Sequence, residues 1–157
     1  MAIDFEIKLD TLENGENDLQ EIAKRVRAVL GVPEAFLETD VVTSPVFLNK
    51  ANRYIYKYIK DYLDIIDLDN VLLQVAYIYH IAYQVCLGMD ARLPKQMENI
   101  STKTIFQTIS WDDKALELLN RCNEALENVL EEYDIEQNLY GTFAELSNEM
   151  DYPNTNI

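Results

Sequence analysis

Three basic side chains, Lys50, Arg53 and Lys57, are spaced three and four residues apart in a chain that is otherwise strongly acidic. On an α-helix this spacing places them along one line, and tyrosines flank that line. Clustered cations bind carboxylates and phosphates, so the pattern favours a contact surface for an acidic partner. The same pattern also fits a solvent-exposed face whose cations balance nearby carboxylates of their own chain.

The sequence contains no set of residues suited to catalysis or to holding a cofactor. Its single histidine, His80, lies in the most apolar segment, where a histidine is more often a hydrogen-bonded structural group than a base or a ligand. No second histidine, Cys-x-x-Cys pair or Asp-rich loop occurs, so the spacing assembles no standard zinc or calcium site. We therefore predict a protein that is not an enzyme and that needs no cofactor or metal.

The composition predicts one folded, acidic domain. The chain has 157 residues, 48% of them hydrophobic, and a formal net charge of −15. Such a charge disfavours a conventional nucleic-acid binder, because phosphate contacts need clustered Lys and Arg. The charge is uneven, since residues 122–157 contain no Lys or Arg at all. Cys86 and Cys122 fall on apolar helical stripes, which favours buried thiols in a reducing compartment over a disulfide.

Apolar periodicity predicts a mainly α-helical fold, a small bundle of about four main helices around a central apolar helix at residues 70–87. Little of the circumference of that helix is polar, so other helices must cover it. Polar side chains nevertheless interrupt it too often for a membrane span, and the N-terminal residues show no secretory signal. We place Asp69 as its N-cap and Gly88 as its C-terminal stop.

Capping residues and apolar stripes predict three further helices. The first covers residues 18–30 and is ended by Gly31. The second begins at Ser44-Pro45 and continues to about residue 63, because Ser caps free amides and Pro is favoured at the first helical position. The last covers residues 112–133, with Ser110 or Asp112 as its cap.

The rest of this single domain consists of two terminal extensions and an arm. In the N-terminal arm, residues 1–17, apolar residues alternate with polar ones, which suits a short edge strand or a segment laid on a neighbouring chain. Residues 88–111 are long for a plain loop, and their second half alternates with a period of two, which favours an extended or hairpin arm that pairs with another chain. Its candidate contact residues are Lys103, Ile105, Phe106, Ile109 and Trp111. Residues 134–157 form an acidic tail.

The stretch from Asp40 to Tyr133 resembles the head–tail connector proteins of tailed bacteriophages, also called adaptor or head-completion proteins. An acidic residue and a short capped start, Asp40 to Pro45, lead into a helix with alanine and aromatic spacing at Phe47, Ala51 and Tyr54. A tyrosine-rich core helix at 72–87 follows, and then a long loop from Leu93-Pro94-Lys95-Gln96 to the start of the last helix at Trp111-Asp112. The residues before 18 and after Tyr133 have no counterpart in that family.

The resemblance implies a structural virion protein at the head–tail interface, made in the host cytoplasm. Its copies would form a homo-oligomeric ring, dodecameric when assembled, docked beneath the portal protein and receiving the tail or stopper on its far side. DNA would pass through the channel without specific binding, and a negative channel suits this because it repels phosphates. The basic line and the arm would then contact a neighbouring subunit or the portal, and no membrane is involved.

A second function fits the same charge. An acidic protein can mimic DNA and occupy a nucleic-acid-binding host enzyme, provided that its carboxylates are spaced over a surface like phosphates. The acidic residues after Cys122 supply such carboxylates. The basic line argues against this function, because cations have no place on a DNA-like face.

Overall fold

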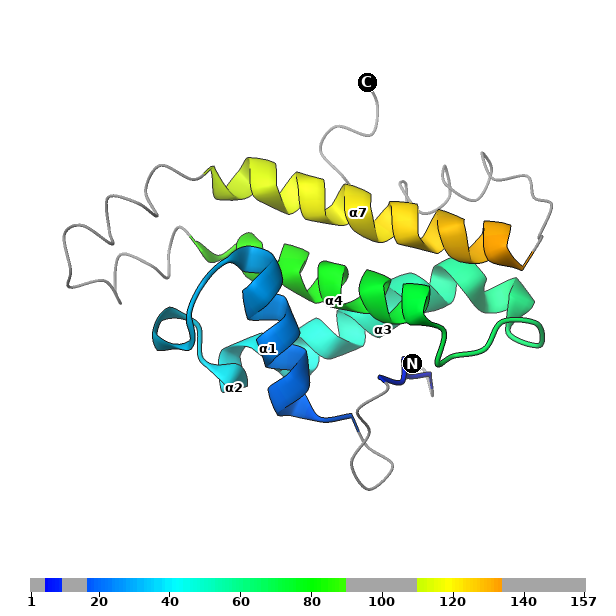
Figure 1. Cartoon of the computed structure of the whole chain (residues 1–157), viewed down its shortest axis with the longest axis horizontal. Coiled ribbons are helices and arrows are strands. Elements are labelled where there is room, and N and C mark those ends of the chain that lie inside the picture. Colours follow the sequence, from blue (N-terminus) through cyan, green and yellow to red (C-terminus); the bar gives the residue numbers. More distant parts are fainter. Residues whose placement is uncertain (1–4, 10–16, 90–109, 134–157) are drawn as a thin grey trace.

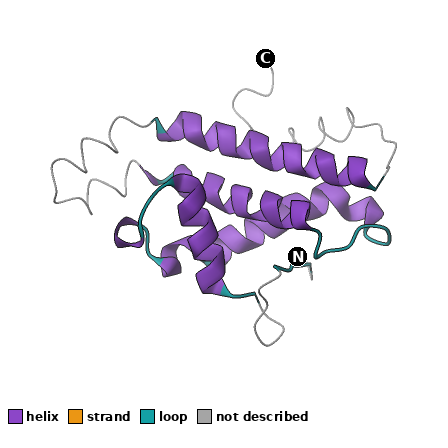
Figure 2. Ribbon diagram, in the orientation of Figure 1, coloured by secondary structure: helices purple, strands orange, loops and turns teal. Residues whose placement is uncertain are grey.

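The computed structural model describes residues 5–9, 17–89 and 110–133. These residues are mainly helical, as the apolar periodicity predicts, and Figure 2 shows no strand among them. Most of the predicted arm, with Lys103, Ile105, Phe106 and Ile109, lies outside the described residues, and so does the acidic tail. The helices are α1 (Leu19–Leu30), α2 (Thr39–Val42), α3 (Pro45–Ile59), α4 (Val71–Cys86) and α7 (Trp111–Glu132), with 3₁₀ turns at Glu34–Phe36 and Lys60–Tyr62.

Helix α4 packs against α1, α3 and α7 and carries much of the core. Helix α7 lies alongside it and antiparallel to it (Figure 1), while α1 and α3 contact its other sides. Short α2 links α1 to α3 and also touches α4. The buried side chains of α4 include Leu73, Ala76, Ile78 and Cys86, which face different sides of the helix. A helix that is apolar nearly all round can be stable in water only when it is covered in this way.

The helix ends follow the predicted signals at α1 and depart from them at α4. The Asp18 side chain accepts a hydrogen bond from the Gln20 amide at 2.9 Å, and Gly31 ends α1 with a left-handed backbone, φ 70°. At α4 the cap is Asn70 and not Asp69, because the Asn70 side chain accepts from the Leu72 amide at 2.8 Å. Asp69 contributes its backbone carbonyl, which accepts from the Gln74 side chain at 2.9 Å.

Helix α3 begins as predicted but ends earlier. Pro45 is its first residue, although the Ser44 side chain makes no capping hydrogen bond. The helix ends at Ile59, four residues before the predicted end, and the chain tightens into the 3₁₀ turn Lys60–Tyr62, a frequent way for a helix to finish. This turn brings Ile66 back into the core, where it is buried.

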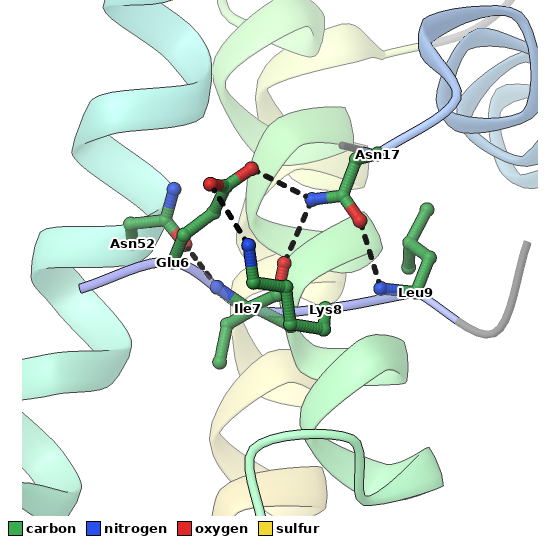
Figure 3. Close-up of polar contacts among 6 residues, drawn as sticks. All are labelled: Glu6, Ile7, Lys8, Leu9, Asn17 and Asn52. Carbon is green, nitrogen blue, oxygen red and sulfur yellow. Dashed lines mark hydrogen bonds and ion pairs between the residues drawn. The ribbon is translucent and has the colours of Figure 1, made fainter. Parts of the chain in front are cut away.

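Residues 5–9 lie extended on the core of their own chain, which differs from both predicted placements. Ile7 and Leu9 are fully buried, so the alternation marks an apolar side that faces inward. Figure 3 shows how side chains replace the hydrogen bonds of a β-ladder. Asn52 Oδ1 accepts from the Ile7 amide at 2.9 Å, Asn17 Oδ1 accepts from the Leu9 amide at 2.9 Å, and Asn17 Nδ2 donates to the Ile7 carbonyl at 2.8 Å.

Trp111 also lies in the core, where the sequence predicts an arm residue that contacts another chain. Ser110 caps α7 by accepting from the Asp113 amide at 3.4 Å, so the helix begins one residue earlier than predicted. As the first helical residue, Trp111 is 2% exposed, and its carbonyl accepts from Cys86 Sγ at 3.2 Å. Its indole therefore packs within its own chain. Cys86 and Cys122 are both buried and form no disulfide, as predicted.

We expect Asn52→Ala to lower the free energy of unfolding by about 1–3 kcal/mol, because the buried Ile7 amide then loses its acceptor. Urea denaturation followed by circular dichroism measures this change. Asn49→Ala removes an exposed asparagine from the same helix and should change stability by less than about 0.5 kcal/mol. Equal stability of the two variants would mean that this hydrogen bond does not hold residues 5–9 in place.

Candidate functional site

The predicted basic line forms part of the wall of a pocket between α3 and α4. Lys50, Arg53 and Lys57 line this pocket, which has a volume of about 340 Å³. Helix α3 contains no acidic residue, and none of the described carboxylates forms an ion pair with Lys50 or Arg53. The other lining side chains, which the sequence assigns only to packing, are Phe47, Tyr54, His80, Tyr83, Gln84 and Leu87. We call this site the α3–α4 pocket.

Two polar side chains of α4 are fixed in this pocket by one another and by α3. Gln84 Nε2 lies 2.8 Å from the Phe47 carbonyl oxygen and 3.0 Å from His80 Nδ1. A carbonyl oxygen can only accept, so the Gln84 atom facing it must be the amide nitrogen, which also donates to His80 Nδ1. His80 Nδ1 is then the acceptor, and the proton of the neutral ring lies on Nε2. The contacts therefore define both the amide orientation and the histidine tautomer.

His80 is neutral at ordinary pH. Burial, with a smaller contribution from the charge of Lys50, lowers the pKa of His80 from 6.5 to about 4. Its ring packs against those of Tyr54 and Tyr83, with centroid distances of 4.6 Å and 5.5 Å. The Tyr54 hydroxyl also donates to Asn123 Oδ1 on α7, which ties the pocket wall to a third helix. A histidine with so low a pKa is a poor base at neutral pH, but it is a good hydrogen-bond donor through Nε2–H.

Each of the two α4 side chains keeps one buried polar atom without a partner. His80 Nε2 and Gln84 Oε1 are inaccessible to solvent, and neither has a hydrogen-bond partner among the described residues. Buried polar groups are paired in the great majority of proteins, and leaving one unpaired costs about 1–3 kcal/mol. With three cations on its walls, the α3–α4 pocket has the chemistry to bind an oxyanion such as a carboxylate or a phosphate.

A second pocket of about 340 Å³, between α1 and α4, lacks this chemistry. Its lining is mostly apolar, with Val29, Val75 and Ile78 among it. The cation that lines it, Arg25, forms an ion pair with Glu21 at 3.1 Å. We therefore take the α3–α4 pocket as the candidate site.

Comparisons with protein families, with curated proteins and with solved structures find no match for this chain. Within residues 5–9, 17–89 and 110–133, no group of three His, Cys, Asp or Glu side chains is placed to hold a metal ion. No helix in the same residues is long and apolar enough to cross a membrane. The chemistry of the α3–α4 pocket is thus the main guide to function.

The sequence predicts the cations of this site but not the two polar side chains of α4, His80 and Gln84, that line it with them. It treats His80 as a structural core group, and the ring is indeed buried, yet this residue also lines the pocket. The available signal was the spacing of four residues between His80 and Gln84, which puts two polar groups on one face of an apolar helix. Trp111, in contrast, does not line this pocket.

Acidification should destabilise the wild-type protein more than a His80→Asn variant. The unfolded chain protonates His80 near pH 6.5 and the folded chain only near pH 4, so between these values the unfolded state binds more protons and stability falls as the pH falls. The extra loss is about 3 kcal/mol at most. Urea denaturation of both proteins across this range measures it, and carboxylate titration cancels in the comparison. Equal pH slopes would show that His80 is not buried in its neutral form.

Proposed function

We propose that the chain is a structural protein of a tailed-phage virion, a head–tail connector subunit. Its copies form a ring beneath the portal, extend the DNA channel and provide the attachment site for the tail or stopper. The main support is the separation of charge on the described surface, where a basic pocket and an acidic end occupy different parts of one chain. Complementary surfaces on one chain favour head-to-tail contacts, which give a ring when the rotation between copies closes.

The acidic end is formed where the α3–α4 connection meets the end of α7 (Figure 1). The Asp67 amide donates to the Tyr133 hydroxyl at 3.2 Å, and the Asn70 side chain donates to a Glu132 carboxylate oxygen at 3.4 Å. Six exposed carboxylates gather here, and we call them the acidic end: Asp61, Asp64, Asp67, Asp69, Glu131 and Glu132. Lys60 is the only cation in residues 60–70.

The acidic end does not stabilise its own helix. Glu131 and Glu132 occupy the last turn of α7, which contains no basic residue. The C-terminus of a helix carries the negative end of its dipole, so carboxylates there are unfavourable by a few tenths of a kcal/mol to about 1 kcal/mol each. Carboxylates that are unfavourable in their own chain are well placed to meet the cations of another.

The α3–α4 pocket and the acidic end are carried by successive parts of the chain. The pocket residues Phe47 to Lys57 belong to α3, whereas the acidic end begins after α3, at Asp61. In a head-to-tail assembly the acidic end of one copy would meet the pocket of the next. The predicted arm residues Lys103, Ile105, Phe106 and Ile109 would add to this contact from a segment outside the described residues.

The basic pocket also weighs against the alternative function, a DNA mimic. A mimic gains nothing from three cations on its surface, because they repel the basic site that it must occupy. The acidic end and α7 would still serve such a role if the pocket faced away from the partner. Direct assays separate the two functions.

Reversal of two pocket charges, Arg53→Glu with Lys57→Glu, should abolish ring formation and leave the helical circular dichroism unchanged. The double variant replaces attraction to the acidic end by repulsion. Light scattering measures mass for the purified chain alone and then with a portal-bearing capsid extract, and negative-stain imaging follows. Lys24→Glu reverses an exposed cation on α1 and serves as the control.

Closed rings or binding at the portal vertex by the wild type, lost only in the double variant, support the connector function. Rings that survive in the double variant place the subunit contact elsewhere. A strict monomer that ignores portals but binds a nuclease or restriction complex identifies the chain as a DNA mimic instead.

A further inference from the structure

The turn after α3 presents a carboxylate between two exposed apolar side chains. Leu63 is 38% exposed and Ile65 is 52% exposed, with the exposed Asp64 between them. The turn has a fixed shape, because the amides of Ile65 and Ile66 both donate to the Tyr62 carbonyl, at 3.0 Å and 2.9 Å. Ile66, the next residue, is buried in the core and anchors the turn there. We call residues 63–65 the acidic turn.

The α3–α4 pocket complements the acidic turn in both polarity and charge. Its apolar wall includes Phe47 and Leu87, and Leu87 is 55% exposed although it follows a buried helix. Its cations stand beside this apolar wall. Large exposed apolar side chains next to opposite charges are the usual composition of a protein–protein contact.

We propose that the acidic turn of one copy binds in the α3–α4 pocket of a second copy, with the Asp64 carboxylate bound by Arg53 and Lys57. This inference rests on the proposed self-assembly and names the residues that anchor it. Leu63 and Ile65 then cover Phe47 and Leu87.

The contact is head-to-tail, because it joins two different surfaces of identical copies. Every copy in such an assembly uses both its turn and its pocket, so the contact repeats from copy to copy. In a two-fold dimer, by contrast, the turn of each copy would have to bind the pocket of the other at the same time. A head-to-tail contact needs only one turn and one pocket, so two full-length variants, one with a changed turn and one with a changed pocket, test it directly.

The turn variant is Asp64→Arg, and the pocket variant is Arg53→Glu with Lys57→Glu. Each is expected to weaken self-association of the full chain at least about tenfold, measured by sedimentation at protein concentrations up to about 1 mM. Mixed together, they should form a one-to-one heterodimer that grows no further, because the mixture retains one working turn and one working pocket. Asp40→Arg, at an exposed aspartate of α2, is the matched control and should associate like the wild type.

His80 reports on the pocket directly, since it is the only histidine of the chain. With ¹⁵N-labelled histidine in the turn variant, addition of the unlabelled pocket variant should shift the Nε2–H resonance. The pKa of His80 should also rise from about 4, because a nearby carboxylate favours the charged ring. With the label in the pocket variant instead, addition of the turn variant should leave the resonance unchanged.

Three results would overturn the inference: a wild-type chain that does not self-associate at about 1 mM, a mixture without heterodimer, or a heterodimer that leaves the labelled His80 of the turn variant unaffected. The connector function is judged separately. If the heterodimer forms but wild-type copies neither close into rings nor bind a portal, the turn–pocket contact stands and the connector function is wrong. If Asp64→Arg assembles on portals as the wild type does, the connector function stands and this contact is wrong.

Discussion

The need to cover α4 on every side governs the rest of the structure. Its buried residues occupy nearly the whole circumference, so α1, α3 and α7 must each pack against it, and the extended residues 5–9 add Ile7 and Leu9 to the same core. Burial of apolar surface at about 25 cal/mol per Å² supplies the driving force for this arrangement. The hydrogen bonds from Asn52 and Asn17 then let an extended segment join a helical core without a β-sheet.

The same constraint builds the candidate site. Polar side chains on so apolar a helix must find partners inside the protein, and Gln84 finds them in the Phe47 carbonyl and His80 Nδ1. These two bonds use the donors of Gln84 and the acceptor of His80, which leaves Gln84 Oε1 and His80 Nε2 buried and unpaired among the described residues. The pocket is therefore a consequence of how α4 is packed against α3, and its polar side chains are held in place by the core.

Residue patterns predict the helices well because each depends on local chemistry. The Asp18 cap and the Gly31 stop bound α1 from within a few residues, and the periodic apolar stripe of α7 needs no knowledge of its neighbours. The features that the sequence does not predict depend on contacts between segments distant in sequence. Alternation in residues 5–9 indicates an extended chain but not that Asn52, 45 residues from Ile7, supplies its partner. Likewise, the spacing of Lys50, Arg53 and Lys57 reveals a basic line, whereas only the fold places His80 beside it.

The net charge of −15 limits how two copies can approach one another. Copies repel at long range, and salt screens this repulsion beyond about 8–10 Å, so association requires local attraction that exceeds it at contact. Lys50, Arg53 and Lys57 provide that attraction at one position, on the wall of the α3–α4 pocket. Most other orientations bring carboxylates together and are disfavoured. A strongly acidic surface that carries a basic pocket thus favours the contact made through that pocket, since the charges that oppose wrong pairings leave this one attractive.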